Sequence, residues 1–218
     1  MQMFRKVIVG AAALATVLTA VPAFAQNQPS NTGLGFGVHF GGNWQTVRTE
    51  ENQFDIDTKA GAGWLAGIWF GGNRDGRVGL MGEVSYLKAK VKFVDPIGEG
   101  TDITSEQTFL QIPVLLRINA GSRSRAGASV YFLVGPAFDI QLDNDDEFTD
   151  LFDDPDDVYE GLNIGAMFGV GFEVARLGVE VRYNYGLKSV LATDAAEAAG
   201  FGSVKTNQLQ IVGKLRIN

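Results

Sequence analysis

Large apolar side chains alternate with small or polar ones over most of the chain. Across 34–40, Leu, Phe, Val and Phe occupy every second position, with glycine or histidine between them. A period of two places the apolar side chains on one face of a β-strand. A less regular pattern, which shifts phase near Leu87, covers 78–93. With these two segments, the sequence predicts eight strands, the others lying over 61–71, 110–118, 130–138, 162–174, 177–185 and 209–217.

The connections between these strands alternate between short and long. Short turns are expected at 72–77, at 120–126 and around Arg176. The other connections are long and polar, and they cover 45–60, 94–104, 143–160 and 189–203. Transmembrane β-barrels of the outer membrane have short periplasmic turns and longer extracellular loops. The pattern therefore predicts which end of the structure faces outward.

The two faces of the predicted strands differ in chemistry. One face is apolar on nearly every strand, and the opposite face is polar and rich in glycine. A soluble, lipocalin-like periplasmic barrel would turn the polar face outward, but this face is too sparse for a solvated exterior. The polar, glycine-rich face suits the narrow interior of a small barrel. In a closed barrel, every backbone N–H and C=O group has a hydrogen-bond partner, which lipid cannot supply. The prediction is an all-β, eight-stranded antiparallel transmembrane β-barrel, with the soluble barrel as the less favoured alternative.

The first 25 residues have the organisation of a secretory signal peptide. Arg5 and Lys6 precede an apolar run over 7–20, and the segment 23–25 offers small residues at the cleavage positions. The run is shorter than the roughly 20 residues that a spanning helix needs. We therefore expect export and cleavage near Ala25, a short segment over 26–32, and a barrel domain over 33–218 in the cell outer membrane.

Charge and cysteine content exclude several kinds of partner. The formal charge is −7, and loss of Arg5 and Lys6 makes the mature chain more acidic. Binding to nucleic acid needs clustered lysine and arginine, which the sequence does not have. The chain has no cysteine, so it has neither a disulfide framework nor a thiolate metal site. We expect no cofactor.

Three segments carry a resemblance to a known family. They are FLQIPVLL at 109–116, GPAF at 135–138 and GVEVRYNYGL at 178–187. With the signal peptide, they resemble the porin-like outer-membrane β-barrel domain family over nearly the whole mature chain. The resemblance implies an eight-stranded barrel that the barrel-assembly machinery inserts, usually without an assigned activity. The chain departs from such barrels at its end, where Arg216-Ile217-Asn218 replaces the terminal aromatic residue that the machinery reads.

The polar face carries charges of both signs, which predicts a lumen charge network. In a barrel this narrow, side chains fill the interior, and buried charges need partners. The network is interpreted as a structural plug of salt bridges, with a selective path for small ions as the alternative. Its predicted members are Glu83, Arg117, Glu173, Glu180, Arg182, Lys214 and Arg216.

The single histidine, His39, points inward by strand parity. A membrane-embedded hydrolase needs a nucleophile, a base and an orienting group within hydrogen-bond reach. No serine is grouped with His39 by spacing or motif, so a lumen histidine without a catalytic role is the favoured interpretation.

Aspartate and glutamate are concentrated in the predicted loop that starts at residue 143. Hard divalent cations bind carboxylate oxygens, which makes this loop a weak candidate for a metal site that bridges to lipopolysaccharide. A solvated acidic loop is the favoured interpretation. The candidate ligands are Asp143, Asp145, Asp146 and Glu147.

Aromatic side chains near the strand ends are candidates for the belts that mark the two membrane–water interfaces. They are Trp44, Trp64, Trp69, Tyr86, Tyr183 and Tyr185.

The predicted function is structural or interactive: a barrel, not an enzyme, that holds loops at the cell surface for adhesion, envelope integrity or binding of an extracellular partner. The alternative is a narrow channel for ions or small polar solutes. The expected surroundings are outer-membrane lipid and lipopolysaccharide, and the sequence does not identify the extracellular partner.

Overall fold

A computed structural model of the chain describes residues 34–49, 58–93, 103–120, 128–145, 161–188 and 204–217. The predicted signal peptide, the segment 26–32 and Asn218 lie outside the described residues. No helix with the length and apolar character of a membrane span occurs in the part of the chain that the structure describes.

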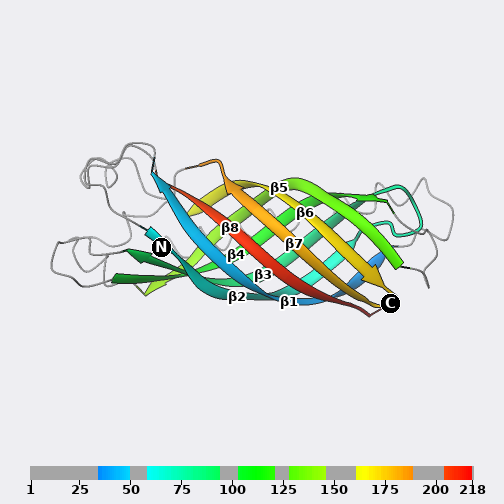
Figure 1. Cartoon of the computed structure of the whole chain (residues 1–218), viewed down its shortest axis with the longest axis horizontal. Coiled ribbons are helices and arrows are strands. Elements are labelled where there is room, and N and C mark those ends of the chain that lie inside the picture. Colours follow the sequence, from blue (N-terminus) through cyan, green and yellow to red (C-terminus); the bar gives the residue numbers. More distant parts are fainter. Residues whose placement is uncertain are drawn as a thin grey trace, which may run out of the picture.

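The described residues form one closed antiparallel barrel (Figure 1). Each strand pairs with the next in the sequence, and β8 closes the barrel by pairing with β1. The prediction of an eight-stranded antiparallel barrel is confirmed. The strands are β1 (Gly35–Thr49), β2 (Thr58–Gly71), β3 (Val78–Phe93), β4 (Ile103–Asn119), β5 (Ala128–Asp145), β6 (Leu162–Val174), β7 (Leu177–Gly186) and β8 (Val204–Arg216).

Several strands are longer than the alternation of apolar residues predicted. β1 runs to Thr49, which pairs with Val204, and β5 runs to Asp145, which pairs with Glu106. The predicted loop starts at 45 and 143 were therefore wrong. Backbone pairing continues past the point where the outward side chains cease to be apolar, so the hydrophobic pattern ends before the strand does.

The apolar pattern of β3 shifts phase near Leu87, as the sequence indicated, but the strand itself does not. The side chains of Glu83, Leu87 and Val91 are all buried, whereas Tyr86 between them is exposed, so the strand keeps one parity. The chemistry of the two faces changes instead, because the inner face becomes apolar beyond Ser85 and the outer face acquires lysines. This half of β3 therefore has a polar outside and an apolar inside.

Most of the barrel has the opposite arrangement. Large apolar side chains are exposed around its outer face, while the buried residues include many charged and amide side chains. A water-soluble barrel would reverse these two sets, so the soluble alternative is excluded. Examples of the exposed apolar set are Phe36, Phe40, Ile68, Phe132, Phe168, Phe172, Val179 and Leu215.

Glycines on the inner face make room for large lumen side chains. Gly37 pairs with Trp69 across β1 and β2. A Cβ atom at Gly37 would lie 2.0 Å from the Leu215 carbonyl oxygen and 2.7 Å from Trp69 Nε1. The indole therefore occupies space inside the barrel that any larger residue at position 37 would need.

Candidate functional site

The structure places all seven residues of the predicted charge network in the lumen. Their side chains come from strands β3, β4, β6, β7 and β8, and each is buried. Strand parity brings them inward, because successive side chains of a strand alternate between its two faces. Ion pairs arrange them in two groups along the barrel.

The first group, here called the central ion cluster, consists of Glu83, Glu180, Arg182 and Lys214. Arg182 binds Glu83 through two hydrogen bonds of 2.7 Å, from Nη1 to Oε2 and from Nη2 to Oε1. Its Nε donates to Glu180 Oε2 at 2.6 Å. Lys214 Nζ lies 2.6 Å from Glu83 Oε1 and 2.9 Å from Glu180 Oε1. Two cations thus face two carboxylates, and each carboxylate contacts both cations.

A tyrosine that the sequence analysis missed completes this cluster. Tyr131 of β5 donates its hydroxyl hydrogen to Glu180 Oε1 at 2.5 Å. Its ring also lies under the guanidinium of Arg117, whose Cζ is 3.7 Å from the ring centroid. Tyr131 therefore connects the central ion cluster to the second group of charges. The parity of β5 was the available signal, because Tyr131 alternates with the outward Val130 and Phe132.

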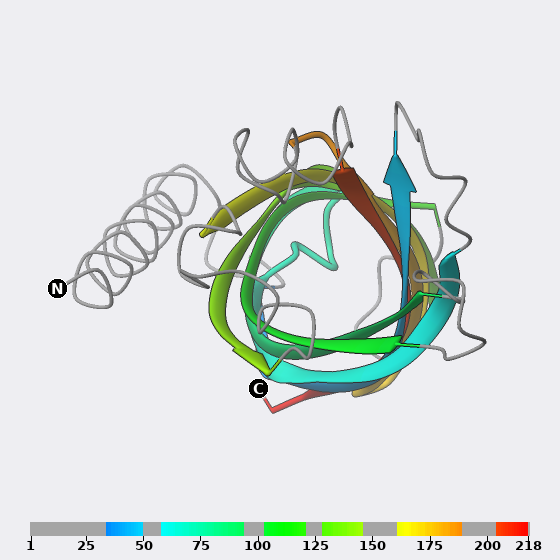
Figure 2. The ribbon, with the colours of Figure 1, turned by 90° about the vertical axis from the view of Figure 1, so that its left-hand side faces the viewer.

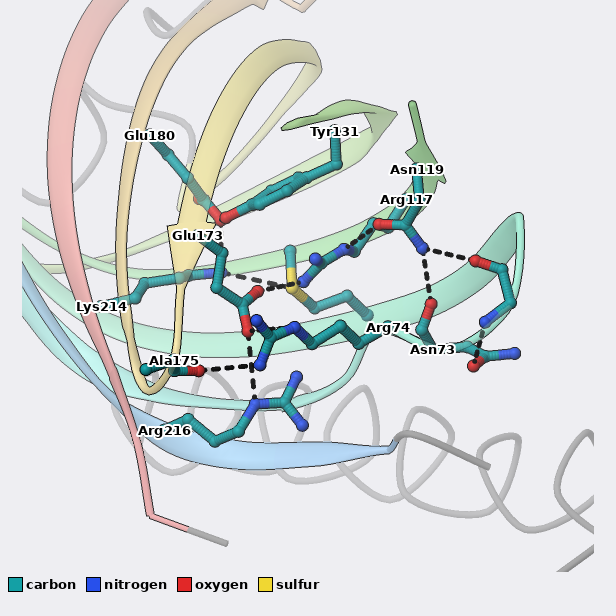
Figure 3. A network of polar contacts seen from close by, with 12 residues as sticks. Asn73, Arg74, Arg117, Asn119, Tyr131, Glu173, Ala175, Glu180, Lys214 and Arg216 are labelled. Carbon is teal, nitrogen blue, oxygen red and sulfur yellow. Dashed lines mark hydrogen bonds and ion pairs between the residues drawn. The ribbon is translucent and has the colours of Figure 1, made fainter. Parts of the chain in front are cut away.

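The second group, here called the mouth cluster, consists of Arg74, Arg117, Glu173 and Arg216 (Figure 3). Arg117 Nη1 donates to Glu173 Oε2 at 2.8 Å. Arg74 Nε and Arg216 Nε lie 3.4 Å and 3.5 Å from Glu173 Oε1. Three guanidinium groups therefore surround a single carboxylate at the end of the barrel that carries the short turns.

The turn between β2 and β3 folds into this end of the barrel. Figure 2, which looks along the barrel, shows it in teal within the ring of strands. Gly71 and Gly72 begin the turn with φ angles of 95° and 67°, in the left-handed region that glycine adopts without steric cost. Asn119 Nδ2 then donates to the carbonyl oxygens of Asn73 and Gly76, at 2.7 Å each.

Arg74 anchors the inserted turn. Only 2% of its surface is exposed, and its Nη1 donates to the carbonyl oxygen of Ala175 at 2.7 Å. Ala175 lies in the turn between β6 and β7, so Arg74 joins two turns that are distant in sequence. The sequence pattern predicted a plain periplasmic turn here and did not indicate that an arginine would reach the lumen.

Amide side chains extend the polar lumen toward the loop end. Gln111 Nε2 donates to Asp139 Oδ1 at 2.8 Å, and Gln210 Nε2 donates to Gln111 Oε1 at 2.9 Å. Gln208 Nε2 donates to Gln45 Oε1 at 3.2 Å, and the Gln45 amide donates to Gln107 at 3.2 Å. Beside this network, five buried apolar side chains form a cluster: Leu65, Leu87, Ala89, Phe109 and Val212.

His39 has a neighbour that the sequence analysis did not find. Its Nε2 lies 2.8 Å from Ser85 Oγ. The two meet across Gly67, which pairs with both and has no side chain to separate them. Glu83 Oε2 is 4.0 Å from the same Nε2 atom, whereas His39 Nδ1 has no hydrogen-bond partner.

This arrangement does not form a hydrolase site. A catalytic serine–histidine pair needs its orienting carboxylate on the other ring nitrogen, but here the serine and the carboxylate share one side of the ring. His39 and Ser85 are also buried, with exposed fractions of 3% and 1%. The geometry is that of a lumen histidine held by a hydroxyl group.

Five of the six predicted belt residues lie on the outer face, and Trp69 does not. Trp44, Trp64, Tyr86 and Tyr183 are exposed, and Tyr185 lies under the guanidinium of Arg48 at 4.5 Å. The Trp64 ring is 6.4 Å from Phe40 and 5.5 Å from Tyr86, between centroids. The assignment of these outward residues to a belt stays a prediction.

Trp69 is a correction, because only 3% of its surface is exposed and it lies in the lumen. Lys214 Nζ and Arg216 Cζ are 5.1 Å and 5.4 Å from its ring centroid. The alternation in β2 already carried this information, since the neighbouring Ile68 and Phe70 face outward.

The predicted acidic loop is only partly described. Asp143 and Asp145 lie within β5 and not in a loop, whereas Asp146 and Glu147 lie outside the described residues. Among the residues that the structure covers, no group of three or more histidine, aspartate or glutamate side chains has a metal-binding arrangement. A metal site in this loop stays an untested prediction.

A protein-family model matches the chain, in agreement with the barrel fold and its polar lumen. The model of the outer membrane protein beta-barrel domain matches residues 24–192. The chain therefore belongs to this family and is a protein of the outer membrane. No curated protein sequence matches the chain.

Several solved structures are similar to the chain. Ail of Yersinia pestis, in complex with the heparin analogue sucrose octasulfate, has a TM-score of 0.43 and 12% identity, and the match covers 84% of this chain and 99% of Ail. OprG of Pseudomonas aeruginosa has a TM-score of 0.49 and 12% identity, with 85% and 94% covered. Neisserial surface protein A has a TM-score of 0.48 and 13% identity, with 85% and 99% covered.

Proposed function

We propose that this protein is a sealed outer-membrane scaffold that presents its long loops at the cell surface for adhesion or partner binding. The observation that supports the proposal is the succession of bonded side chains along the lumen of the described residues. The inserted β2–β3 turn and the mouth cluster occupy one end, the central ion cluster follows, and the amide network with its apolar neighbours lies beyond it.

A continuous ion path would require several of these contacts to break together. Arg182 alone makes two hydrogen bonds to Glu83 and more to Glu180, and both of these carboxylates are fully buried. Side chains fill the interior of eight-stranded barrels of this size. The scaffold role also gives the long, polar connections of the sequence a purpose, since surface loops on a rigid frame commonly carry binding function.

Conductance measurement tests the closed lumen. The purified barrel in a planar lipid bilayer is expected to produce no unitary current steps, while a wide porin in the same bilayer serves as the positive control. Steps of constant size that disappear when Arg182 is changed would contradict the proposal and establish the narrow channel.

Loop shortening tests the display role separately. Bacteria that display the wild-type chain should adhere to matrix-coated plates, and replacement of residues 146–160 by a short glycine–serine turn should reduce adherence. Unchanged heat-modifiability of the barrel on gels is the control for folding. Equal adherence by wild-type, shortened and empty-vector cells would refute the surface role.

The same proposal includes contact with lipopolysaccharide at the loop end of the barrel. Lys88 and Lys90 face outward on β3, directly beyond Tyr86, and Lys88 pairs with Trp64 across the strands. Lys90 also forms an ion pair with Glu106. Lysines beside an aromatic cluster are placed to meet anionic headgroups at the membrane surface. Insertion by the barrel-assembly machinery and cleavage near Ala25 belong to this proposal as well.

The lipid contact predicts a selective effect of charge removal. Lys88→Gln is expected to weaken retention of lipopolysaccharide about five-fold, since one basic residue near an anionic surface contributes about 1 kcal/mol. Mass spectrometry of lipid A that co-purifies with the barrel measures this. Arg77→Gln, which removes one exposed charge at the opposite end, is the matched control. An equal loss in both variants would contradict a specific site on β3.

A further inference from the structure

The connections at the two ends of the barrel carry opposite charges. The long connections contain many acidic residues and one basic residue, Lys188, whereas the short ones contain five arginines and a single aspartate. The long connections cover 50–57, 94–102, 146–161 and 187–203, and the short ones cover 72–77, 120–127 and 175–176. The formal charge of the whole chain is −7, so the basic turn end does not follow from the overall composition.

The basic residues are also divided by type along the barrel. Apart from Lys214 in the central ion cluster, the lysines of the strands lie toward the loop end, in β2, β3 and β8. At the turn end the basic residues are arginines, and the mouth cluster already places three of them around Glu173. A guanidinium group is planar and presents paired N–H donors to phosphate or carboxylate oxygens, whereas an ammonium group acts as a point charge. The turn end is therefore suited to an anion with such oxygens.

Arg77 and Arg176 are the exposed part of this basic end. Each lies in a turn whose backbone is fixed to the neighbouring strand. The Asn119 N–H donates to the Arg77 carbonyl oxygen, and the Arg216 N–H donates to the Arg176 carbonyl oxygen, both at 2.8 Å. Both side chains are exposed, and neither forms an ion pair with a carboxylate of the described residues. Two guanidinium groups thus remain available to an external anion.

The position of these arginines relative to the apolar outer face indicates what they meet. Val78 follows Arg77 and is 49% exposed, and Leu177 follows Arg176 and is 62% exposed. The polar headgroups of a bilayer lie directly outside its hydrocarbon core. Arginines at the edge of the lipid-facing band are therefore level with the headgroups, which favours lipid phosphates over the more distant carboxylates of the cell wall.

From the division of charge, the exposed guanidinium groups and their depth, we propose that Arg77 and Arg176 bind the phosphate groups of anionic phospholipids in the periplasmic leaflet of the outer membrane. Arg77 is bonded to β4 and Arg176 to β8, which are opposite each other in the closed strand order. The two arginines therefore bind separate lipid molecules and hold the rim at the level of the headgroups. The proposal does not depend on what the loops bind or on contact with lipopolysaccharide at the other end.

A fluorescent reporter beside one arginine tests the lipid preference. The chain has no cysteine, so the full-length mature barrel with Leu177→Cys takes a single label next to Arg176. Labelled barrels are placed in phosphatidylcholine vesicles that contain an equal fraction of brominated phosphatidylglycerol or brominated phosphatidylcholine. The local enrichment of phosphatidylglycerol, measured from quenching, should be about five-fold, which corresponds to about 1 kcal/mol for one basic residue near an anionic surface. Equal quenching by the two lipids would overturn the proposal.

Matched variants locate the effect. In the Leu177→Cys barrel, Arg176→Gln should reduce the enrichment to about one-fold, because the only new change is the loss of the adjacent charge. Lys88→Gln, which removes a charge at the loop end, should leave the enrichment unchanged. An equal reduction in both variants would show that the reporter senses the net charge of the barrel and would refute binding by Arg176. Unchanged heat-modifiability on gels is the control for folding.

A second reporter tests the opposite side of the rim independently. Val78→Cys carries the label next to Arg77, and Arg77→Gln should abolish the enrichment there while Arg176→Gln retains it. Enrichment at Val78→Cys that survives Arg77→Gln would refute the assignment of this arginine.

Co-sedimentation with purified peptidoglycan separates lipid from the cell wall. The wild-type barrel and the double variant Arg77→Gln/Arg176→Gln should remain in the supernatant to the same extent. Sedimentation of the wild type that the double variant loses, together with equal quenching by the two brominated lipids, would overturn the lipid assignment and identify the cell wall as the anionic partner.

Discussion

Arg182→Met should destabilise the barrel by about 3–5 kcal/mol, the usual cost of removing one partner of a buried ion pair. The guanidinium of Arg182 binds both carboxylates of the central ion cluster. Without it, Glu83 and Glu180 share the single ammonium group of Lys214 in a water-excluded lumen. Methionine keeps the unbranched aliphatic part of the side chain and removes the guanidinium with its charge and its hydrogen bonds.

Guanidinium titration of the barrel in phospholipid vesicles, followed by tryptophan fluorescence, measures the free energy of unfolding. Lys90→Met is the control, because Lys90 pairs with Glu106 on the outer face, where about 40% of each side chain is exposed, and such pairs contribute about 1 kcal/mol or less. The double variant Glu83→Gln/Arg182→Met leaves Glu180 paired with Lys214 and should be more stable than Arg182→Met. An Arg182→Met barrel within 1 kcal/mol of wild type would show that the cluster does not stabilise the fold.

Phe168→Arg should destabilise the barrel by about 2–4 kcal/mol in lipid, the range for arginine on the lipid face at the bilayer midplane. Phe168 lies midway along β6 and faces outward with half of its surface exposed. Its neighbours on that face, Ala166 and Val170, offer no counter-charge. The arginine side chain would therefore have to reach the interface or draw water into the bilayer.

Val174→Arg is the matched control, because Val174 ends the same strand on the same face. Near the interface, the expected cost falls to about 0–1 kcal/mol. The difference between the two variants measures depth in the membrane and not arginine content. Equal costs at both positions would show that the outer face of β6 does not cross a bilayer.

Local sequence determined the strands and the assignment of their faces. Successive side chains of a strand point to opposite sides, so the alternation in 162–174 and 177–185 was sufficient to place Glu173, Glu180 and Arg182 inside and Phe168 outside. The same rule would have placed Trp69 in the lumen. The preference of tryptophan for membrane interfaces suggested the outer face. The position of Trp69 in the alternation of its strand was the stronger evidence, and it indicates the lumen.

Only the tertiary structure decided which inward residues meet. His39 and Ser85 are 46 positions apart, and their contact depends on two strand registers and on Gly67 between them. Arg74 reaches Ala175 over 101 positions, because closure of the barrel brings two turns to one mouth. Neither contact leaves a periodic signal in the sequence.

Thus the sequence by itself determined a membrane barrel with a polar interior, since strand period and face polarity are local properties of the chain. The tertiary structure decided how that interior is organised: two ion clusters and an inserted turn. The physical reason is that register, shear and closure, which the sequence pattern does not encode locally, set the distances between side chains on different strands.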